Sequence, residues 1–170
     1  HVDLYEMRPV KNTPAHHTDK LAELVCSNSL RSKELSNAAG LLKEEMKKLK
    51  SLIIEVAEKN QVPAGGALAV DRDKFSSNIT NAIESHPNIT IHRKEVDSIP
   101  EPCAIIASGP LTSPGLSKAI ADLLGNEYLY FYDAAAPIVT RESINMEKAF
   151  WASRYSKGDD DYLNLPLTKE

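Results

Sequence analysis

The stretch Val2-Asp3-Leu4-Tyr5-Glu6-Met7-Arg8-Pro9 is a short β-prone run that ends in an acidic and then a basic side chain. The second strand of a dinucleotide-binding βαβ unit ends in this way, because a carboxylate at its tip accepts hydrogen bonds from the ribose hydroxyls of adenosine. Ordinary surface strands also end in Glu and Arg. Glu6 is therefore a candidate ribose-binding residue only if the rest of the sequence supports it.

The composition is that of an ordinary globular protein. Of 170 residues, 42% are hydrophobic and 26% are charged, which is enough for a domain with a real core. No apolar run is long enough to span a bilayer, and no basic-then-apolar leader opens the chain. Cys26 and Cys103 form no CxxC pair, so a disulfide framework is not indicated and we expect a cytoplasmic protein.

Two polar segments follow the first strand. Residues 10–19 are predicted to be a loop, and the adjacent His16 and His17 have no partner at ligand spacing, so no metal site is predicted. The turn Cys26-Ser27-Asn28-Ser29-Leu30-Arg31-Ser32 is rich in hydrogen-bond donors. It suits either a helix cap or the edge of a phosphate or flavin.

Residues 36–60 are predicted to form one helix, because apolar residues recur at steps of three and four and make one buried stripe: Leu42, Met46, Leu49, Ile53 and Val56. Most of the lysines in this segment lie off the stripe, on a face that is more typical of solvent exposure than of RNA binding. With a net charge of −4, we expect any tRNA binding by this chain to be weak and to fade steeply with salt.

The next segment, residues 61–72, contains two adjacent glycines. Gly65 and Gly66 predict either a positive φ or a close approach of the backbone to another group, and they do not form a P-loop. Asp71 is placed to cap a helix over residues 72–85, whose inner face would carry Phe75, Ile79, Ala82 and Ile83. Arg72 lies at the helix start, where the dipole disfavours a cation, which indicates some other contact.

Two further strands are predicted. Ile89–His92 alternates between apolar and polar residues, and Ala104–Ser108 continues from Cys103 as an apolar run of the kind that a parallel sheet covers on both faces. That run ends at Gly109, where ligands reach the carboxyl edge of an open α/β sheet. Cys103 is expected to be a small core residue.

The last third of the sequence predicts a helix and an aromatic strand. Ser113 and Pro114 open the helix over residues 116–124, and Gly125 closes it. Residues 128–133 are the aromatic strand. Later signals are mixed: residues 157–161 suggest a solvated loop, and we expect packing among Phe150, Trp151 and Tyr155.

Seven motifs occur in a fixed order at residues 5–9, 13–18, 24–32, 41–46, 62–72, 108–113 and 128–137. They include Tyr5-Glu6-Met7-Arg8-Pro9, Thr13-Pro14-Ala15-His16-His17-Thr18 and Ser108-Gly109-Pro110-Leu111-Thr112-Ser113. Together they closely resemble the folate- and FAD-dependent tRNA (uracil-5-)-methyltransferases of bacteria, and the resemblance covers essentially the whole chain. One departure is Leu165, where many relatives are expected to carry cysteine, which leaves a redox role at that position open.

The resemblance implies a chemistry. A one-carbon unit passes from methylenetetrahydrofolate to uracil C5 in the T-loop of tRNA and is reduced through FAD, with NAD(P)H as reductant. Glu6 would hold the adenosine ribose, and Cys26 would be a catalytic thiol close to the flavin, more reactive toward thiol reagents than Cys103. A second cysteine, which attacks uracil C6, would lie beyond residue 170. The other residues implied to bind the cofactor are Met7, Arg8, Ser27, Asn28, Ser29, Arg31, Val96, Ser108 and Gly109.

We therefore expect an α/β fold. Residues 1–127 would be part of a Rossmann-like FAD-binding domain of the two-dinucleotide-binding flavoprotein type, and residues 128–170 the start of an inserted tRNA-side domain. Val2–Glu6, Ile89–His92 and Ala104–Ser108 would be its parallel strands. The first strand and glycine-rich turn of such a domain are absent from this sequence. We expect unpaired sheet edges that favour self-association, and neither tight FAD binding nor tRNA methylation by this chain alone.

Two alternatives stay open. Flavin-dependent enzymes that modify the wobble uridine of tRNA share the general fold, but they should lack the run from Cys26 to Arg31. A non-catalytic interaction module is a different class of answer. An activity assay of the chain beside a full-length relative separates these hypotheses.

Overall fold

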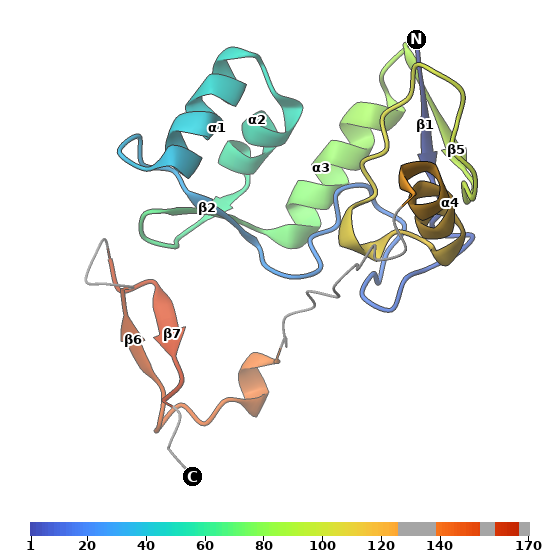
Figure 1. Ribbon diagram of the computed structural model, residues 1–170. Helices are drawn as coiled ribbons and strands as arrows, with labels where there is room; N and C mark the ends of the chain where they lie inside the picture. The colour runs from blue at the N-terminus through green and yellow to red at the C-terminus, as the bar shows by residue number, and fades with distance from the viewer. Residues whose placement is uncertain (126–138, 154–158, 167–170) are drawn as a thin grey trace. The chain divides into compact units, whose positions relative to one another are not determined.

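The computed structural model describes residues 1–125, 139–153 and 159–166 (Figure 1). The chain divides into two compact units, which we treat separately. Unit 1 consists of His1–Cys26 and Thr80–Ala135, and unit 2 consists of Ser27–Ile79 and Ala136–Glu170. The domain boundary expected near residues 127 and 128 stays a prediction.

Unit 1 is built on two parallel strands, β1 (Val2–Glu6) and β5 (Ile89–Arg93), which run side by side in Figure 1. Their register runs from Val2 opposite Ile89 to Glu6 opposite Arg93. Side chains alternate between the two faces of such a pair, so Leu4 and Ile91 share one face. The predicted parallel strands at these two places are confirmed, and Glu6 lies at the carboxyl end of the pair.

Helix α4 (Pro114–Leu124) forms in unit 1 where the sequence predicts it. The Ser113 side chain accepts a hydrogen bond from Leu116 N at 3.5 Å, and Pro114 is tolerated because the first turn has no helical partner for an N–H. Gly125 ends the helix with a φ of +63°, a conformation that glycine adopts without strain.

The predicted parallel strand over Ala104–Ser108 is wrong: these residues form no strand, and Ile105 is 93% exposed. Cys103, expected in the core, is exposed as well. An apolar run becomes a buried strand only where a neighbouring strand takes up its hydrogen bonds. Among the described residues β1 and β5 pair only with each other, and Pro102 and Pro110 on either side of the run lack an N–H to donate. A short 3₁₀ helix, η1 (Gly109–Leu111), follows.

Unit 2 contains a three-stranded antiparallel sheet in the order β2-β4-β3, formed by β2 (Ser29–Ser32), β3 (Gln61–Val62) and β4 (Ala67–Val70). The central strand β4 is buried continuously from Leu68 to Val70. Among the described residues of this unit, the buried hydrophobic ones are Ile54, Val56, Ala57, Ala64, Leu68, Ala69, Val70, Phe75 and Ile79.

The single helix predicted over residues 36–60 is two helices, α1 (Ala38–Lys48) and α2 (Leu52–Lys59). The break falls at Lys50, whose φ is +58°, and the amide of Ser51 closes α1 by donating to Met46 O at 3.0 Å. The predicted stripe is broken with it. Val56 is buried at 6% exposure, whereas Leu49 is 82% exposed.

Helix α3 (Arg72–Glu84) matches the predicted helix. Asp71 Oδ1 accepts a hydrogen bond from Lys74 N at 3.1 Å, and Phe75 and Ile79 of the predicted inner face are buried. In the turn before β4, Gly65 has a φ of +54°, and a Cβ on Gly66 would stand 2.8 Å from Glu34 Oε1. Both predicted uses of glycine are confirmed.

A short 3₁₀ helix, η2 (Arg141–Ser143), and the antiparallel strands β6 (Phe150–Ala152) and β7 (Tyr162–Asn164) complete the described part of unit 2. Tyr162 Oη donates to Ala64 O at 2.9 Å, and Gly65 N donates to Asp161 Oδ2 at 2.7 Å. The predicted strand over residues 128–133 and the aromatic Tyr155 lie outside the described residues. Within the described ranges, each helix is too short or too polar to cross a bilayer.

Candidate functional site

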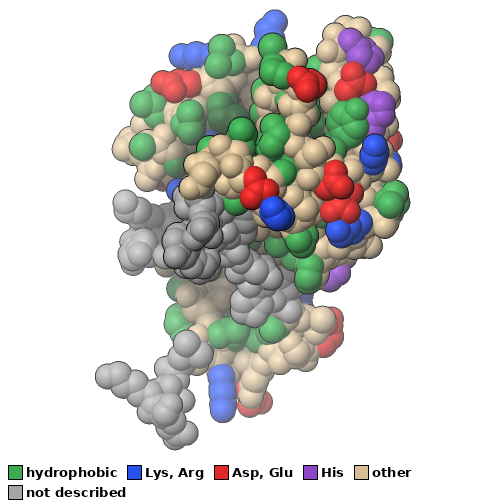
Figure 2. All heavy atoms as spheres, turned by 45° about the vertical axis from the view of Figure 1, so that its right-hand side comes forward, with side chains coloured by type: hydrophobic (Ala, Val, Ile, Leu, Met, Phe, Trp, Pro, Cys, Tyr) green, Lys and Arg blue, Asp and Glu red, His purple; other side chains and the backbone are tan. Residues whose placement is uncertain are grey.

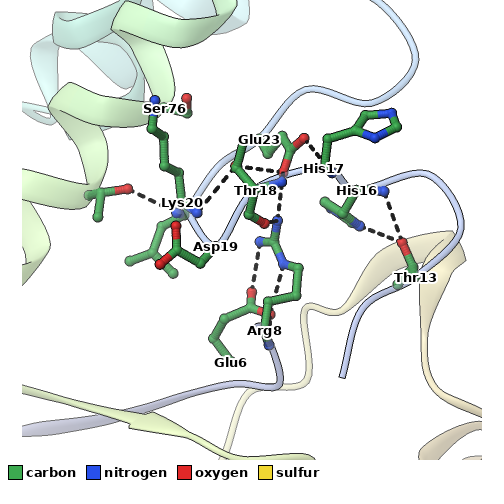
Figure 3. Close-up of polar contacts among 12 residues, drawn as sticks. Glu6, Arg8, Thr13, His16, His17, Thr18, Asp19, Lys20, Glu23 and Ser76 are labelled. Carbon is green, nitrogen blue, oxygen red and sulfur yellow. Dashed lines mark hydrogen bonds and ion pairs between the residues drawn. The ribbon is translucent and has the colours of Figure 1, made fainter. Parts of the chain in front are cut away.

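Arg8 joins the carboxyl end of β1 to the loop that follows it (Figure 3). The residue is only 4% exposed. Its Nε and Nη2 donate to Glu6 Oε1 and Oε2, both at 3.0 Å, and its backbone N donates to Glu6 Oε1 at 2.9 Å. The guanidinium therefore holds the carboxylate through two side-chain hydrogen bonds, the geometry in which such pairs are strongest.

The other side of the Arg8 guanidinium meets Glu23. Arg8 Nη1 donates to Glu23 Oε2 at 3.0 Å and to Thr18 O at 3.2 Å. Glu23 also accepts hydrogen bonds from His17 N at 2.9 Å, Thr18 N at 3.1 Å and Thr18 Oγ1 at 2.8 Å. One buried cation is thus shared between two carboxylates, which meets the requirement that a buried charge be paired and hydrogen-bonded. We call Glu6, Arg8 and Glu23 the Arg8 cluster.

The Arg8 cluster keeps both of its carboxyl groups ionised. Burial alone would raise the pKa of Glu6, but the hydrogen bonds and charge of Arg8 outweigh it and lower the pKa below its ordinary value. Burial would likewise raise the pKa of Glu23, and the hydrogen bonds from His17 and Thr18 lower it. The nearby His16 has a pKa lowered by burial and then by the charge of Arg8, which favours its neutral form.

A second arginine ties this loop to the sheet. Arg93, opposite Glu6 in the strand register, donates from Nη1 to Arg8 O at 3.1 Å and to Asp19 O at 2.7 Å. The predicted loop over residues 10–19 does lack helix and strand, and hydrogen bonds to side chains give it a defined course instead. Glu6 is therefore held at a fixed place relative to β5.

The arrangement leaves Glu6 able to bind one more donor. Its two oxygens accept three hydrogen bonds from Arg8, two at Oε1 and one at Oε2, whereas a carboxylate has about four acceptor sites. Its side chain is 21% exposed, compared with 5% for Arg8. Arg8 faces Glu6, Glu23 and Thr18, so its geometry gives it a supporting role, and direct cofactor binding by Arg8 stays a prediction.

The other predicted site residues of unit 1 are more exposed or lie in loops. Met7 and Val96 are half-buried, and Cys26 is exposed and forms no disulfide with Cys103. Ser108 Oγ lies 2.6 Å from Thr112 Oγ1. The φ of Gly109 is +67°, so this turn requires glycine or strain.

Four predicted site residues, Ser27, Asn28, Ser29 and Arg31, belong to unit 2. Asn28 is pinned to β4, since its Nδ2 donates to Val70 O at 3.0 Å and its O accepts from Val70 N at 2.9 Å. Ser27 Oγ and Ser29 Oγ accept hydrogen bonds from the backbone two residues ahead. The run enters strand β2 rather than capping a helix, and its assembly with Glu6 into one site stays a prediction.

Sequence reasoning missed Glu23 and Thr18. Glu23 lies within an otherwise apolar run, Leu21 to Val25, and nothing in its spacing shows that it would turn toward Arg8. The only signal was an acidic residue interrupting that run, half-buried in the structure.

A family model described as "Glucose inhibited division protein A" matches residues 1–170. Three curated relatives, each called methylenetetrahydrofolate–tRNA-(uracil-5-)-methyltransferase, come from Bacillus pumilus, Bacillus subtilis and Natranaerobius thermophilus. They are 62%, 61% and 65% identical to this chain over 169, 169 and 170 residues. Each match covers 99% of this chain and 39% of the relative, so the chain spans about two fifths of the length of these proteins.

Proposed function

The chain belongs to the glucose inhibited division protein A family, and from this premise we propose that it is the FAD-facing part of a tRNA (uracil-5-)-methyltransferase. The carbon donor is methylenetetrahydrofolate, the substrate is tRNA in the cytoplasm, and NAD(P)H reduces the flavin. The names of the relatives support the donor and the tRNA substrate. The presence of the run from Cys26 to Arg31 favours this activity over modification of the wobble uridine.

The observation that carries the proposal is the state of Glu6. It ends the first of two parallel strands, as the ribose-binding acid of a dinucleotide-binding fold does. A ribose hydroxyl is a neutral donor, and Glu6 is an ionised acceptor with one site to spare. In this proposal residues 1–127 are part of a Rossmann-like domain, and residues 128–170 begin the tRNA-side domain.

Cys26 is proposed to act beside the flavin, and the exposure of both cysteines changes how this is tested. Cys26 is expected to react faster with thiol reagents because it would be a partly ionised thiol beside the flavin and Cys103 would lie inside a strand, yet both thiols are exposed, so burial does not separate them. Labelling rate is therefore a poor discriminator. Loss of activity in Cys26→Ser, with Cys103→Ser as the matched control, is the sharper measurement.

Among the described residues, the face drawn in Figure 2 offers no large basic surface for tRNA. Figure 2 shows acidic and basic side chains interspersed over the face drawn. On α1, Lys47 is paired with Glu58 at 2.8 Å, so part of the lysine-rich segment is neutralised within the chain. Base contacts elsewhere in the full-length enzyme would then supply much of the specificity.

A chimera tests the proposed function. Residues 1–170 replace the matching segment of the Bacillus subtilis relative, and the product is assayed for methyl transfer to tRNA with FAD and methylenetetrahydrofolate. We expect 5-methyluridine to form, and Glu6→Gln to weaken FAD binding. A chimera that folds and binds FAD but modifies only the wobble uridine would support the sister class instead. One that binds neither FAD nor tRNA would support an interaction module.

A further inference from the structure

Glu23 is already engaged in four hydrogen bonds within unit 1. Its Oε2 accepts three hydrogen bonds, from Arg8 Nη1, Thr18 N and Thr18 Oγ1, and its Oε1 accepts one from His17 N. A carboxylate offers about four acceptor sites, and Glu23 already accepts four hydrogen bonds, one more than Glu6. The side chain is 14% exposed. Its effect on the site is therefore sought through Arg8, His17 and Thr18, the residues that it contacts.

Arg8 is the group through which Glu23 reaches the ligand-facing residue. Nε and Nη2 of its guanidinium hold Glu6, while Nη1 is held by Glu23 and Thr18 O. Because a guanidinium is planar and rigid, fixing one nitrogen fixes the direction of the others. Figure 3 shows Arg8 between the two carboxylates.

We propose that Glu23 is a positioning residue: by holding Arg8 Nη1 it keeps the guanidinium on Glu6 and leaves the remaining acceptor site of Glu6 Oε2 directed at one neutral hydroxyl donor of the ligand. The proposal rests on the proposed role of Glu6 in binding ribose. It adds a residue outside the β1 strand end to that site, and it assigns Arg8 to the support of Glu6.

Two simpler accounts predict different results. If Glu23 acted on Glu6 only through its charge, removing it would lower the pKa of Glu6, since a nearby negative charge disfavours a second one. If Glu23 only anchored the loop, removing it would leave the pKa of Glu6 in place. Under the positioning account, Arg8 loses its hold and the pKa of Glu6 rises toward its ordinary value. The other charged or titratable groups around Glu6 are Arg8, His16 and Arg93, and all three residues are retained in the variants, although the charge of Glu23 also raises the pKa of His16.

The test follows the Glu6 carboxyl carbon by NMR titration of the ligand-free 170-residue protein. Glu23→Met removes every acceptor, and we expect a raised pKa of Glu6. Glu23→Gln retains an oxygen for Arg8 and should restore most of the wild-type value. A fall in both variants would establish the charge account, and no change in either would establish the loop account. Each of these two outcomes overturns the proposal.

Thr18→Val is the matched control, because it removes the hydrogen bond from Thr18 Oγ1 to Glu23, together with the one that Thr18 Oγ1 accepts from Lys20 N, and leaves the Arg8–Glu23 pair intact. It should leave the pKa of Glu6 unchanged, and a rise as large as that of Glu23→Met would overturn the proposal. Should Glu23→Met fail to fold, Glu23→Asp replaces it. That variant keeps the negative charge on a side chain that is one methylene shorter. A rise in the pKa of Glu6 would then come from the lost hold on Arg8 and not from a lost charge.

FAD binding to the chimera is measured separately in the same variants. If the pKa of Glu6 shifts as expected but Glu6→Gln leaves FAD affinity unchanged, positioning stands and the proposed function of Glu6 fails. If Glu6→Gln weakens FAD binding and Glu23→Met does not shift the pKa of Glu6, the proposed function of Glu6 stands and positioning by Glu23 fails.

Discussion

The two units are held together in different ways. Of the buried hydrophobic residues in the described ranges, those of unit 1 are Leu21 and Leu116, whereas unit 2 contributes nine, from Ile54 to Ile79. Unit 1 instead buries Arg8, with carboxylates on both sides. Apolar packing depends little on pH or on a single partner, but a buried ion cluster depends on every member.

The difference fits the proposed function, in which Glu6 of unit 1 binds a ribose hydroxyl. A site for a neutral, polar ligand group needs acceptors in fixed positions. The hydrogen bonds of a cation shared between two carboxylates hold the carboxylate oxygens in such positions. An apolar core cannot do this, because it has no direction. We infer that unit 1 gives up some tolerance to change in return for orienting Glu6, while unit 2 provides stability that is less sensitive to conditions.

The largest expected effect comes from Arg8→Met. Removal of the cation leaves Glu6 and Glu23 poorly solvated and unpaired, which should lower the local stability of unit 1 by about 3–5 kcal/mol. Amide hydrogen exchange measures this directly. Lys94 N, which donates to Glu6 O, reports on unit 1, and Val70 N, which donates to Asn28 O, reports on unit 2.

Lys48→Met is the control for this experiment, since it removes an exposed cation from α1 and should change stability by no more than about 0.5 kcal/mol. Loss of protection at Lys94 with retention at Val70 would support the comparison. Equal loss at both amides would show that the two units unfold together.

Acidification should lower the stability of unit 1 by less than Arg8→Met does, and it should again affect unit 1 more than unit 2. The pKa values of Glu6 and Glu23 are lowered by folding, so their stabilisation is fully present above the ordinary value of 4.5 and is lost as pH falls through the lower folded values. Exchange at Lys94, corrected for the intrinsic rate, should therefore speed up below pH 4.5 while Val70 changes less. In Arg8→Met the contribution of Glu6 should invert, because burial then raises the pKa of Glu6 once the hydrogen bonds and charge of Arg8 are lost, whereas the hydrogen bonds from His17 and Thr18 still lower the pKa of Glu23.

A modest and pH-independent effect is expected from Ile54→Val in unit 2. Ile54 is 4% exposed, and loss of one buried methylene should destabilise that unit by about 0.5–1.5 kcal/mol. Protection at Val70 should fall and that at Lys94 should not. A pH-dependent loss would mean that charged groups support unit 2 more than its apolar core suggests.

Local chemistry predicted the parts of the fold that depend on local rules. Asp71 before α3 and Gly125 after α4 act within one helical turn, and the strand pair β1 and β5 shows its apolar alternation directly in the sequence. Gly65 and Gly66 were likewise recognisable, because glycine readily adopts the positive φ of Gly65 and leaves room for the Glu34 carboxylate beside Gly66. The α/β class follows from these elements.

The features that were predicted wrongly or missed depend either on a distant partner in the sequence or on the φ of one residue, and neither is visible in a local pattern. The run Ala104–Ser108 has the composition of a buried strand but pairs with no described neighbour. The apolar periodicity over residues 36–60 continues through Lys50. The helix break at Lys50, where φ is +58°, leaves no mark in that periodicity. Glu6 was identified by its place at a strand end, whereas Glu23 becomes visible only when the loop has folded around Arg8.

The smallest effect is expected where an ion pair is exposed. Lys59 Nζ lies 2.6 Å from Glu55 Oε1 on the surface of α2, and the side chains are 66% and 58% exposed. The distance is shorter than any in the Arg8 cluster, yet water screens the pair and ordering two long side chains opposes it. We expect Glu55→Gln to leave the urea midpoint and the exchange at Val70 within experimental error. A loss comparable to that of Arg8→Met would contradict the view that burial, rather than distance, makes the Arg8 cluster important for stability.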